Sequence, residues 1–305
     1  MDSEQQQWVD RFIAHLLFER RMSGHTAAAY RFDLRALAGF CDRRKLPAWQ
    51  ALDHAQIRAF AAAEHAGGLA PRSVQRRLAA ARSFFAYLER EGASRQNPAI
   101  AVRAPRARKR LPTTLDADQM AQLLAFRADD RLSVRDKAIM ELFYSSGLRL
   151  AELVGLNLAA IDLKDRTVRV LGKGDRTRIV PIGRYAIAAL QVWLRERPAL
   201  IAAGARAADA AALFLGRGGR RLSPRAIQLR VRTWARRQGF GLRVHPHMFR
   251  HSFATHLLES SGNLRGVQEL LGHADIGTTQ IYTHLDFQHL AKVYDSAHPR
   301  ARRRR

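Results

Sequence analysis

Cysteine is almost absent from this chain of 305 residues, in which Cys41 is the only one. A single thiol cannot form an internal disulfide or build a cysteine-based zinc site. Long apolar runs are absent too: uncharged stretches reach ten residues, as in Tyr185–Leu194, whereas a membrane-spanning helix needs roughly 20. The first residues also lack the basic-then-apolar pattern of a secretory signal. These absences predict a soluble, cytoplasmic protein with no membrane insertion.

Acidic residues are scarce relative to basic ones. The chain has 52 Lys and Arg against 27 Asp and Glu, which gives a formal net charge of +25. A positive field of that size attracts polyanions, so nucleic acid is the expected partner. An anionic membrane surface is the alternative. Because 47% of the residues are hydrophobic, the chain can bury a core and is not disordered by composition.

Two common patterns for phosphate chemistry are missing. The sequence has no Gly-x-x-x-x-Gly-Lys-Ser/Thr loop, so ATP is not an expected ligand. It also lacks an acidic cluster of the kind that holds Mg²⁺, since Asp162, Asp165 and Asp175 are scattered. A reaction at a phosphate would then rely on side chains alone. We therefore predict an enzyme that works without metal, ATP or any other cofactor.

Proline and basic residues mark a boundary between two domains. In residues 104–113, Pro105 and Pro112 bracket four basic residues with no acid among them, and proline disfavours a continuing helix. We predict an N-terminal domain over residues 1–103, a basic linker over 104–113 and a C-terminal domain over 114–305. All three parts carry excess positive charge, which fits a chain that wraps around an anionic rod.

The N-terminal domain has helical periodicity throughout. Apolar residues recur at helical spacing in four segments, and Thr26 is the expected N-cap of the second. The fourth segment opens at Pro71 and carries a stripe of arginines that could bind DNA phosphates, with a solvated face as the alternative. The stripe consists of Arg72, Arg76, Arg77 and Arg82. The basic residues of the linker are further candidates for DNA contact: Arg106, Arg108, Lys109 and Arg110.

The C-terminal domain is predicted to be mostly helical with one small sheet. Alternating residues in Thr167–Leu171 and Thr177–Pro181 flank a glycine-containing turn, a pattern typical of a β-hairpin. The alanine-rich stretch Ala199–Ala212 is expected to be a loop. Helices are expected over Asp116–Phe126, Val134–Ser146, Arg184–Glu196, Pro224–Arg237, Phe249–Leu258, Leu264–Leu271 and Gln288–Ala297. The predicted fold class is thus mainly α: an all-helical bundle, then a mostly α domain with a small antiparallel β-sheet.

Candidate reactive side chains gather in the C-terminal domain. They are Arg149, Lys173, His247, Arg250, His273 and Tyr282. Each alone has an ordinary explanation, such as a surface ion pair between Arg149 and Glu152. Together they suit phosphodiester chemistry, because an arginine contacts two phosphate oxygens at once and a phenol can act as nucleophile. Histidine and lysine side chains can move the protons.

These six residues, in this order, resemble the active-site signature of the tyrosine recombinases. Four further segments are similar to the bacterial Xer members of that family: Gly147–Leu156, His251–His256, Leu264–His273 and Thr278–His289. The resemblance covers nearly the whole chain and implies a helical DNA-binding domain followed by a catalytic domain. Phe249 departs from the leucine that the family often has between the histidine and the arginine, and we expect it to pack beneath its helix.

The resemblance implies a role for each residue of the signature. The two arginines would hold the scissile phosphate, the two histidines would add hydrogen bonds, and His247 would assist proton movement. Lys173 would protonate the 5′ oxygen that leaves. Tyr282 would attack phosphorus and leave a 3′-phosphotyrosyl link, whose bond energy allows rejoining without ATP. Which group removes the proton of Tyr282 stays open.

The resemblance also implies partners. The chain would act on a double-stranded DNA recombination site, in a heterotetramer with a XerD-type recombinase and under an FtsK-type translocase as regulator. It would convert chromosome and plasmid dimers to monomers for segregation at cell division. Three other functions stay open: a phage or transposon integrase, a type IB topoisomerase, and a DNA-binding protein without catalytic activity.

Overall fold

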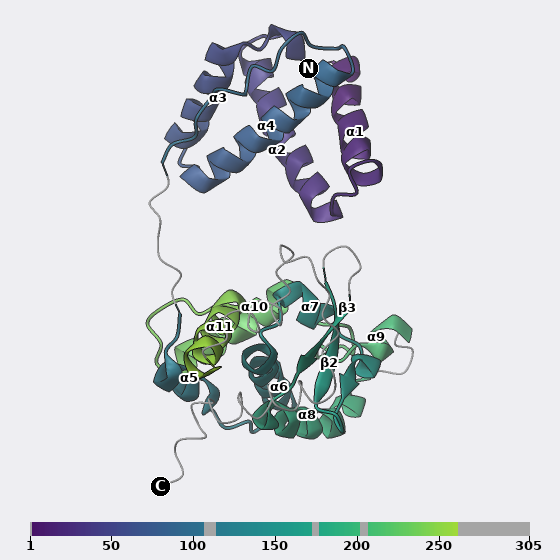
Figure 1. Cartoon of the computed structure of the whole chain (residues 1–305), viewed down its shortest axis with the longest axis vertical. Helices are drawn as coiled ribbons and strands as arrows, with labels where there is room; N and C mark the ends of the chain where they lie inside the picture. The colour runs from purple at the N-terminus through teal and green to yellow at the C-terminus, as the bar shows by residue number, and fades with distance from the viewer. Residues whose placement is uncertain (1, 107–113, 173–176, 202–206, 262–305) are drawn as a thin grey trace. The chain divides into compact units, whose positions relative to one another are not determined.

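The chain divides into two compact units, each with a hydrophobic core of its own (Figure 1). The computed structural model describes residues 2–106, 114–172, 177–201 and 207–261. The first unit is Met1–Arg110 and the second Leu111–Arg305. This division falls within the basic linker of the sequence analysis. The exact domain ends given there stay a prediction.

The N-terminal unit is a bundle of helices. They are α1 (Ser3–Phe18), α2 (Gly24–Arg43), α3 (His54–Ala66) and α4 (Pro71–Arg90), with a 3₁₀ turn at Trp49–Ala51. Helix α4 packs against the other three (Figure 1). Aromatic rings fill the centre, where the ring centroid of Phe84 lies 5.4 Å from that of Phe12 and 5.0 Å from that of Trp49. The prediction of an all-helical bundle is confirmed.

The start of α2 differs from the prediction. Ser23, not Thr26, is the N-cap: its hydroxyl accepts a hydrogen bond from the backbone N–H of Thr26 at 3.2 Å. Ser23 has the extended backbone that an N-cap requires, with φ −63° and ψ 146°. Thr26 was the wrong choice because it already lies within the first helical turn.

The C-terminal unit is built around one buried helix. Its helices are α5 (Ala117–Leu124), α6 (Arg131–Ser146), α7 (Leu150–Gly155), α8 (Arg184–Glu196), α9 (Ala207–Ala211), α10 (Pro224–Arg237) and α11 (Pro246–Ser261). Short 3₁₀ turns occupy Leu158–Ala160 and Arg197–Leu200. Helix α6 contacts α5, α8, α10 and α11 and is buried along most of its length (Figure 1). These helices therefore pack around α6.

Most of the expected helices in this unit are present, with corrections at their ends and in one loop. Helix α5 ends at Leu124 rather than Phe126, and α6 begins at Arg131 rather than Val134 because Asp130 caps it. Helix α11 begins at Pro246 rather than Phe249, and so includes His247. The alanine-rich stretch Ala199–Ala212 is not simply a loop, because it contains α9; alanine has the highest helix propensity of all residues. The helices expected over Leu264–Leu271 and Gln288–Ala297 lie outside the described residues.

The predicted hairpin is confirmed and belongs to a three-stranded sheet. Antiparallel strands β1 (Ile161–Asp162), β2 (Thr167–Leu171) and β3 (Thr177–Pro181) lie in that order. Strand β1 escaped prediction because two residues are too few for an alternating pattern. Across the hairpin, Val168 pairs with Val180 and Val170 with Arg178. Arg178 thus shares the face of the sheet on which the valines are buried.

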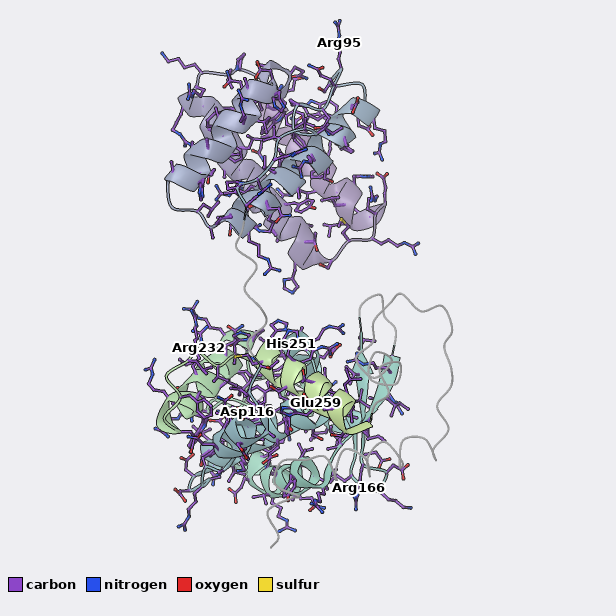
Figure 2. The ribbon with its side chains drawn as sticks, turned by 60° about the vertical axis from the view of Figure 1, so that its left-hand side comes forward. Arg95, Asp116, Arg166, Arg232, His251 and Glu259 are labelled. Carbon is purple, nitrogen blue, oxygen red and sulfur yellow. The ribbon has the colours of Figure 1, made fainter. Side chains whose placement is uncertain are left out.

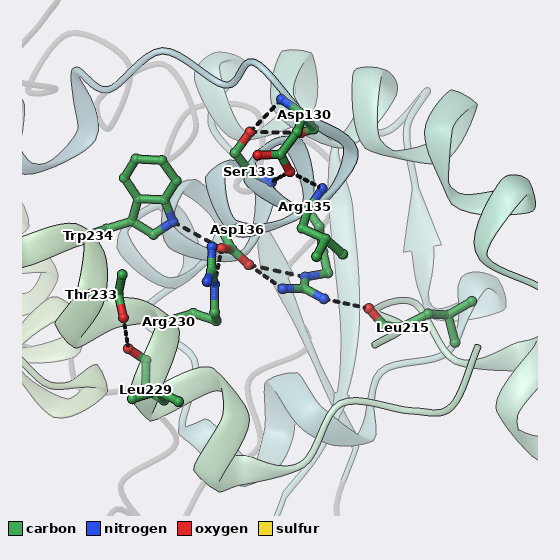
Figure 3. Close-up of polar contacts among 10 residues, drawn as sticks. Asp130, Ser133, Arg135, Asp136, Leu215, Leu229, Arg230, Thr233 and Trp234 are labelled. Carbon is green, nitrogen blue, oxygen red and sulfur yellow. Dashed lines mark hydrogen bonds and ion pairs between the residues drawn. The ribbon is translucent and has the colours of Figure 1, made fainter. Parts of the chain in front are cut away.

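A network of buried charges joins α6 to α10 (Figure 3). Arg135 donates to Asp136 from Nη2 (2.6 Å) and to the carbonyl of Leu215 from Nη1 (2.9 Å). The second carboxylate oxygen of Asp136 accepts from Arg230 Nε at 2.5 Å and from Trp234 Nε1 at 2.9 Å. Every polar group of a buried carboxylate needs such partners. The network therefore fixes α10 against the central helix.

The part of the chain that the structure describes has neither a membrane span nor a metal-binding cluster. No helix there is both long and apolar enough to traverse a bilayer. No group of three His, Cys, Asp or Glu side chains among those residues is placed to hold a metal ion.

Candidate phosphate-binding active site

A sharp turn between α6 and α7 brings two predicted residues into place. Helix α6 ends at Ser146, and Gly147 follows with φ 55°, a left-handed conformation that favours glycine. Arg149 is the N-cap of α7, and its backbone N–H donates to Glu152 Oε2 at 2.7 Å. The reciprocal contact of a capping box is typical of such a helix start. The turn thereby sets Arg149 beside Glu152.

The carboxylate of Glu152 is the centre of the site. Its Oε1 accepts from Arg149 Nη1 at 2.9 Å and from Arg178 Nη1 at 2.8 Å, and its Oε2 accepts from Arg178 Nη2 at 2.9 Å. The side chain is only 6% exposed. Burial by itself raises the pKa of Glu152, but hydrogen bonds from Arg178 and Arg149 outweigh burial and bring the pKa down to about 2. Glu152 is therefore ionised at neutral pH.

Arg250 adds a third guanidinium group. It lies on α11, is 9% exposed, and donates from Nη1 to the carbonyl of Gly147 at 2.7 Å. Burial lowers the pKa of Arg250 to about 10; the charge of Arg149 and, more weakly, that of Arg178 act in the same direction, whereas Glu152 opposes them. Arg250 still carries its proton at pH 7. We call Arg149, Glu152, Arg178 and Arg250 the arginine cluster; three guanidinium groups against one carboxylate leave two positive charges.

Two serines hold the sheet against the end of α6. Ser146 donates from Oγ to the carbonyl of Pro181 at 3.0 Å, and Ser145 accepts at Oγ from the backbone N–H of Gly183 at 2.6 Å. These bonds tie the end of β3 to the point where the turn to α7 begins. Strand β3 is consequently held where Arg178 can contact Glu152.

An aromatic contact with α6 holds α11, the helix that carries Arg250. Phe249 is fully buried, and its ring centroid lies 5.9 Å from that of Phe143 on α6. This confirms the expectation that an apolar residue at this position packs beneath the helix. The anchor fixes the α11 backbone next to Arg250.

His247 lies at the start of the same helix, in a second basic region. It is exposed, and its ring centroid is 6.3 Å from that of His245. Burial lowers the pKa of His245, and the positive field of His247, His251, Arg232 and Arg243 lowers it further. Two of these neighbours, Arg232 of α10 and His251 of α11, are labelled in Figure 2. The junction of α10 and α11 is therefore electropositive.

The six residues of the predicted signature fare differently. Arg149 and Arg250 are brought close enough for their charges to interact, and His247 lies three residues before Arg250 on α11. Lys173, His273 and Tyr282 lie outside the described residues. Sequence reasoning missed Arg178 and treated Glu152 only as a surface ion-pair partner. A signal for Arg178 existed: it is two residues from Val180, so an arginine shares a strand face with a buried valine and needs a carboxylate partner.

Two of the four arginines predicted to bind DNA on α4 surround a buried acid. Arg76 donates from Nη1 to Asp33 at 2.5 Å, and Arg77 pairs with Glu64 and lies 3.7 Å from Asp33. Burial raises the pKa of Asp33, although Arg76 and Arg77 act in the opposite direction. The side chain of Arg77 is only 12% exposed, whereas Arg76 is exposed. Arg77 thus helps to join α2, α3 and α4.

The remaining basic candidates divide between structural and exposed positions. Arg82 donates to the carbonyls of Ala99 (3.0 Å) and Val102 (2.5 Å) and so fixes the chain that follows α4. Arg72 is exposed, and together with Arg76 it lines a hollow of about 560 Å³ on α4. Arg106 is exposed. Three candidates lie outside the described residues: Arg108, Lys109 and Arg110.

Comparison with known proteins decides the family. Residues 113–289 match the model of the phage integrase family, and residues 9–92 match that of the phage integrase N-terminal SAM-like domain. A tyrosine recombinase XerC of Azotobacter vinelandii is 56% identical over 298 residues, covering 97% of each chain. The chain belongs to the phage integrase family of tyrosine recombinases. A further tyrosine recombinase XerC, from Xanthomonas campestris, is 53% identical over 297 residues, which are 97% of this chain and 90% of that relative.

Solved structures agree with this fold. The recombinase resembles XerH bound to its difH substrate, both before cleavage (TM-score 0.69, 18% identity, covering 94% of this chain and 91% of XerH) and after it (TM-score 0.71, 21% identity, covering 93% of each). The resemblance to tyrosine recombinases, and to their Xer members, is confirmed. The chain is thus a DNA recombinase of this family.

Proposed function

We propose that this recombinase cuts and rejoins DNA at a specific site with Tyr282 as the nucleophile. The hydroxyl of Tyr282 gives its proton to a basic group of the site, with His247 assisting the transfer, and the phenolic oxygen attacks phosphorus. The bond from phosphorus to the 5′ oxygen breaks, and Lys173 gives that oxygen a proton. The products are a 3′-phosphotyrosyl link and a free 5′-hydroxyl. Attack by the 5′-hydroxyl of another strand reverses these steps and releases Tyr282. No bond energy is lost, so rejoining needs no ATP, and the arginines take the part that a metal ion would have in neutralising the phosphate.

The observation that carries this proposal is the surplus charge of the arginine cluster. Arg149 and Arg250 contact the non-bridging oxygens of the scissile phosphate, with His247 and His273 adding hydrogen bonds. A phosphodiester has one negative charge, and its transition state for attack by an oxygen has two. The two net positive charges of the cluster match the second value better than the first. Such a site binds the transition state more tightly than the substrate, which is the condition for catalysis.

Exposed arginines of the N-terminal unit and the linker supply further DNA contacts. Arg72 and Arg76 on α4 bind phosphates, as do Arg106 and the basic residues that follow it. Arg77 and Arg82 act indirectly, since their contacts lie within the unit. Binding by many such contacts falls steeply as salt rises, by about 10³-fold or more between 50 and 200 mM for six or more phosphates.

We also propose a cellular role, which the XerC relatives that cover nearly the whole chain support. The recombinase pairs with a XerD-type recombinase in a heterotetramer on a double-stranded recombination site. It converts chromosome and plasmid dimers to monomers before cell division, in the cytoplasm, where an FtsK-type translocase regulates it.

A covalent trapping experiment tests the nucleophile. With a nicked suicide DNA substrate, the wild-type recombinase should form an adduct that peptide mapping assigns to Tyr282. Tyr282→Phe should bind the DNA with an affinity within about twofold of wild type, because a lone hydroxyl is one contact among many, and should form no adduct. Tyr185→Phe, on α8 of the same unit, is the matched control and should form the adduct normally. An adduct in Tyr282→Phe, or a nucleotide on another residue, contradicts the proposal.

Two further measurements separate the alternatives. Cleavage should continue in excess EDTA, and a requirement for added Mg²⁺ would argue against the arginine-based mechanism. A type IB topoisomerase would relax supercoiled DNA alone, and an integrase would recombine sites unrelated to the host chromosome. The proposed recombinase should instead need its XerD-type partner for complete strand exchange on the host's own resolution site.

A further inference from the structure

We propose that Arg178 is a positioning residue of this recombinase: from strand β3 it grips the carboxylate of Glu152, which in turn holds Arg149 in place for the scissile phosphate. The inference rests on the proposed function, because it assigns a task to Arg178 within the phosphate site described there. It adds a residue that is not part of the predicted signature.

The hydrogen bonds of Glu152 support this assignment. A carboxylate accepts about four hydrogen bonds, and Glu152 receives two from Arg178 and two from Arg149. The two from Arg178 come from different nitrogens and reach different oxygens, which is the bidentate geometry of the strongest ion pairs. This fork fixes the plane of the carboxylate. Rotation of that plane would carry Oε1 away from Arg149 Nη1.

Arg178 is better supported than the residue it positions. Its side chain is 17% exposed, and it lies on β3. Strand β2 pairs with β3 in register, and Ser146 ties the end of β3 to α6. The side chain of Arg149 is 40% exposed, and α7 has only six residues. A fixed strand can therefore transmit its position through Glu152 to a more exposed arginine.

Charge gives Arg178 a second way to act on the same residue. Hydrogen bonding from Arg178 is the largest effect that opposes burial and keeps the pKa of Glu152 low; the backbone hydrogen bond from Arg149 comes next, followed by the charge of Arg178. Without Arg178, burial would raise that pKa, and a protonated Glu152 would lose an acceptor for Arg149. Lysine at position 178 would keep the charge but could not reach both oxygens in parallel. Geometry and charge can thus be separated by substitution.

The first test measures cleavage and binding separately. Adduct formation on a suicide substrate is followed in a single turnover at saturating protein, and the Kd for the same DNA is measured independently. Arg178→Ala should slow cleavage by about 100-fold, the size of effect expected when a catalytic group shifts by an ångström. Its Kd should change by less than about threefold, because the site is one phosphate contact among many. Arg178→Lys should recover only part of the lost rate.

A matched control lies on the adjacent strand. Arg169 of β2 is exposed and pairs in register with Ile179, so it lies on the opposite face of the sheet from Arg178. Arg169→Ala should cleave at the wild-type rate. Thermal unfolding of every variant checks that the unit is folded, and Arg178→Lys is used for all comparisons if Arg178→Ala does not fold.

The second test asks whether Arg178 acts through Glu152. In a double-mutant cycle, Glu152→Gln combined with Arg178→Ala should cleave within about threefold of the slower single variant, because both changes remove the same support for Arg149. A rate equal to the product of the two single effects would mean that Arg178 acts on DNA by itself, and would overturn the inference.

A pH profile gives a readout that a purely structural role would not move. The wild-type cleavage rate should show no loss from protonation of Glu152 between pH 5 and 8, since the pKa of that group is about 2. In Arg178→Ala or Arg178→Lys the rate should fall further than in wild type as pH drops from 7 to 5. If Arg178→Ala keeps both the wild-type pH profile and the wild-type rate, the role of Arg178 is overturned and the proposed function is unaffected. A wild-type protein that forms no adduct on Tyr282 overturns the proposed function as well.

Discussion

Two carboxylates in the C-terminal unit are each held by two arginines, yet their surroundings differ. Asp136 is 1% exposed, and its partner Arg135 is 4% exposed. Its second partner, Arg230, also lies within electrostatic reach of Asp130, so two arginines face two acids. At Glu152, Arg149 is 40% exposed and Arg250 adds a third guanidinium group.

The difference in charge and exposure separates two uses of an arginine–carboxylate ion pair. In the Asp136 network the charges balance and the donors end on protein acceptors, so the network stabilises the contact of α6 with α10. In the arginine cluster positive charge is in excess and one arginine is open to solvent, as the proposed binding of a phosphate requires. Charge balance and exposure, rather than the presence of arginine, distinguish the binding site from the structural network.

The largest expected effect is a loss of protein stability when the charge-balanced network of Asp136 is broken. Asp136→Asn should lower the free energy of unfolding by about 3–5 kcal/mol, because it leaves Arg135 buried without its counter-charge. Urea unfolding measures this change. Asp129→Asn is the control, since Asp129 is 70% exposed and its removal should change stability by no more than about 0.5 kcal/mol. A loss below about 1 kcal/mol in Asp136→Asn would show that the network is not structural.

The same contrast can be tested within α4. Arg77→Ala should cost about 1–3 kcal/mol of stability, because it removes the donor to the part-buried carboxylate of Glu64 and a positive charge 3.7 Å from the buried carboxylate of Asp33. Arg72→Ala should leave stability within about 0.5 kcal/mol but reduce the slope of log affinity for DNA against log salt by about one. Urea unfolding and fluorescence anisotropy provide the two measurements. Equal effects of both variants on stability would remove the distinction.

Sulfate should stabilise the protein through the cluster with excess charge. At a sulfate concentration ten times its Kd, a single site adds about 1.4 kcal/mol to the free energy of unfolding. Thermal unfolding in sulfate and in chloride at equal ionic strength should show this gain in wild type and not in Arg250→Ala. Sulfate also stabilises proteins generally by exclusion from their surface; the smaller gain that remains in Arg250→Ala reports that contribution, and Arg169→Ala should gain as much as wild type. An equal gain in Arg250→Ala would place the sulfate elsewhere.

The smallest expected effect is a pH dependence from a half-buried histidine. His256 Nδ1 lies 2.9 Å from the hydroxyl of Tyr144, and burial lowers the pKa of His256 below its ordinary value. The unfolded chain then binds a proton that the folded protein does not, so stability is present above the ordinary pKa and falls as pH drops below it. His256→Gln should lose less stability than wild type between pH 7.5 and 5.5 in urea unfolding. His251→Gln, at an exposed position of α11, should behave as wild type.

Local patterns in the sequence were sufficient for most elements. Helical spacing located α1 to α4 and α6, α8 and α10, and alternation around a glycine-containing turn located β2 and β3. The signature of the family picked out Arg149 and Arg250. Elements that lack enough residues for a repeat were missed, as with β1, and so was the helix hidden in an alanine-rich stretch. The cap of α2 was misassigned because two hydroxyl residues lie within one turn.

Tertiary structure alone decided what each charge does. Helical spacing puts Arg72 and Arg77 on one segment, but only packing shows that Arg77 meets Asp33 and Glu64 while Arg72 stays exposed. Arg178 and Glu152 are 26 residues apart, and no local pattern pairs them. Backbone propensity and apolar periodicity act over a few residues and are written in the sequence. The partner of a charge depends on which surfaces the folded chain brings together, and that choice placed Glu152 at the centre of the proposed phosphate site.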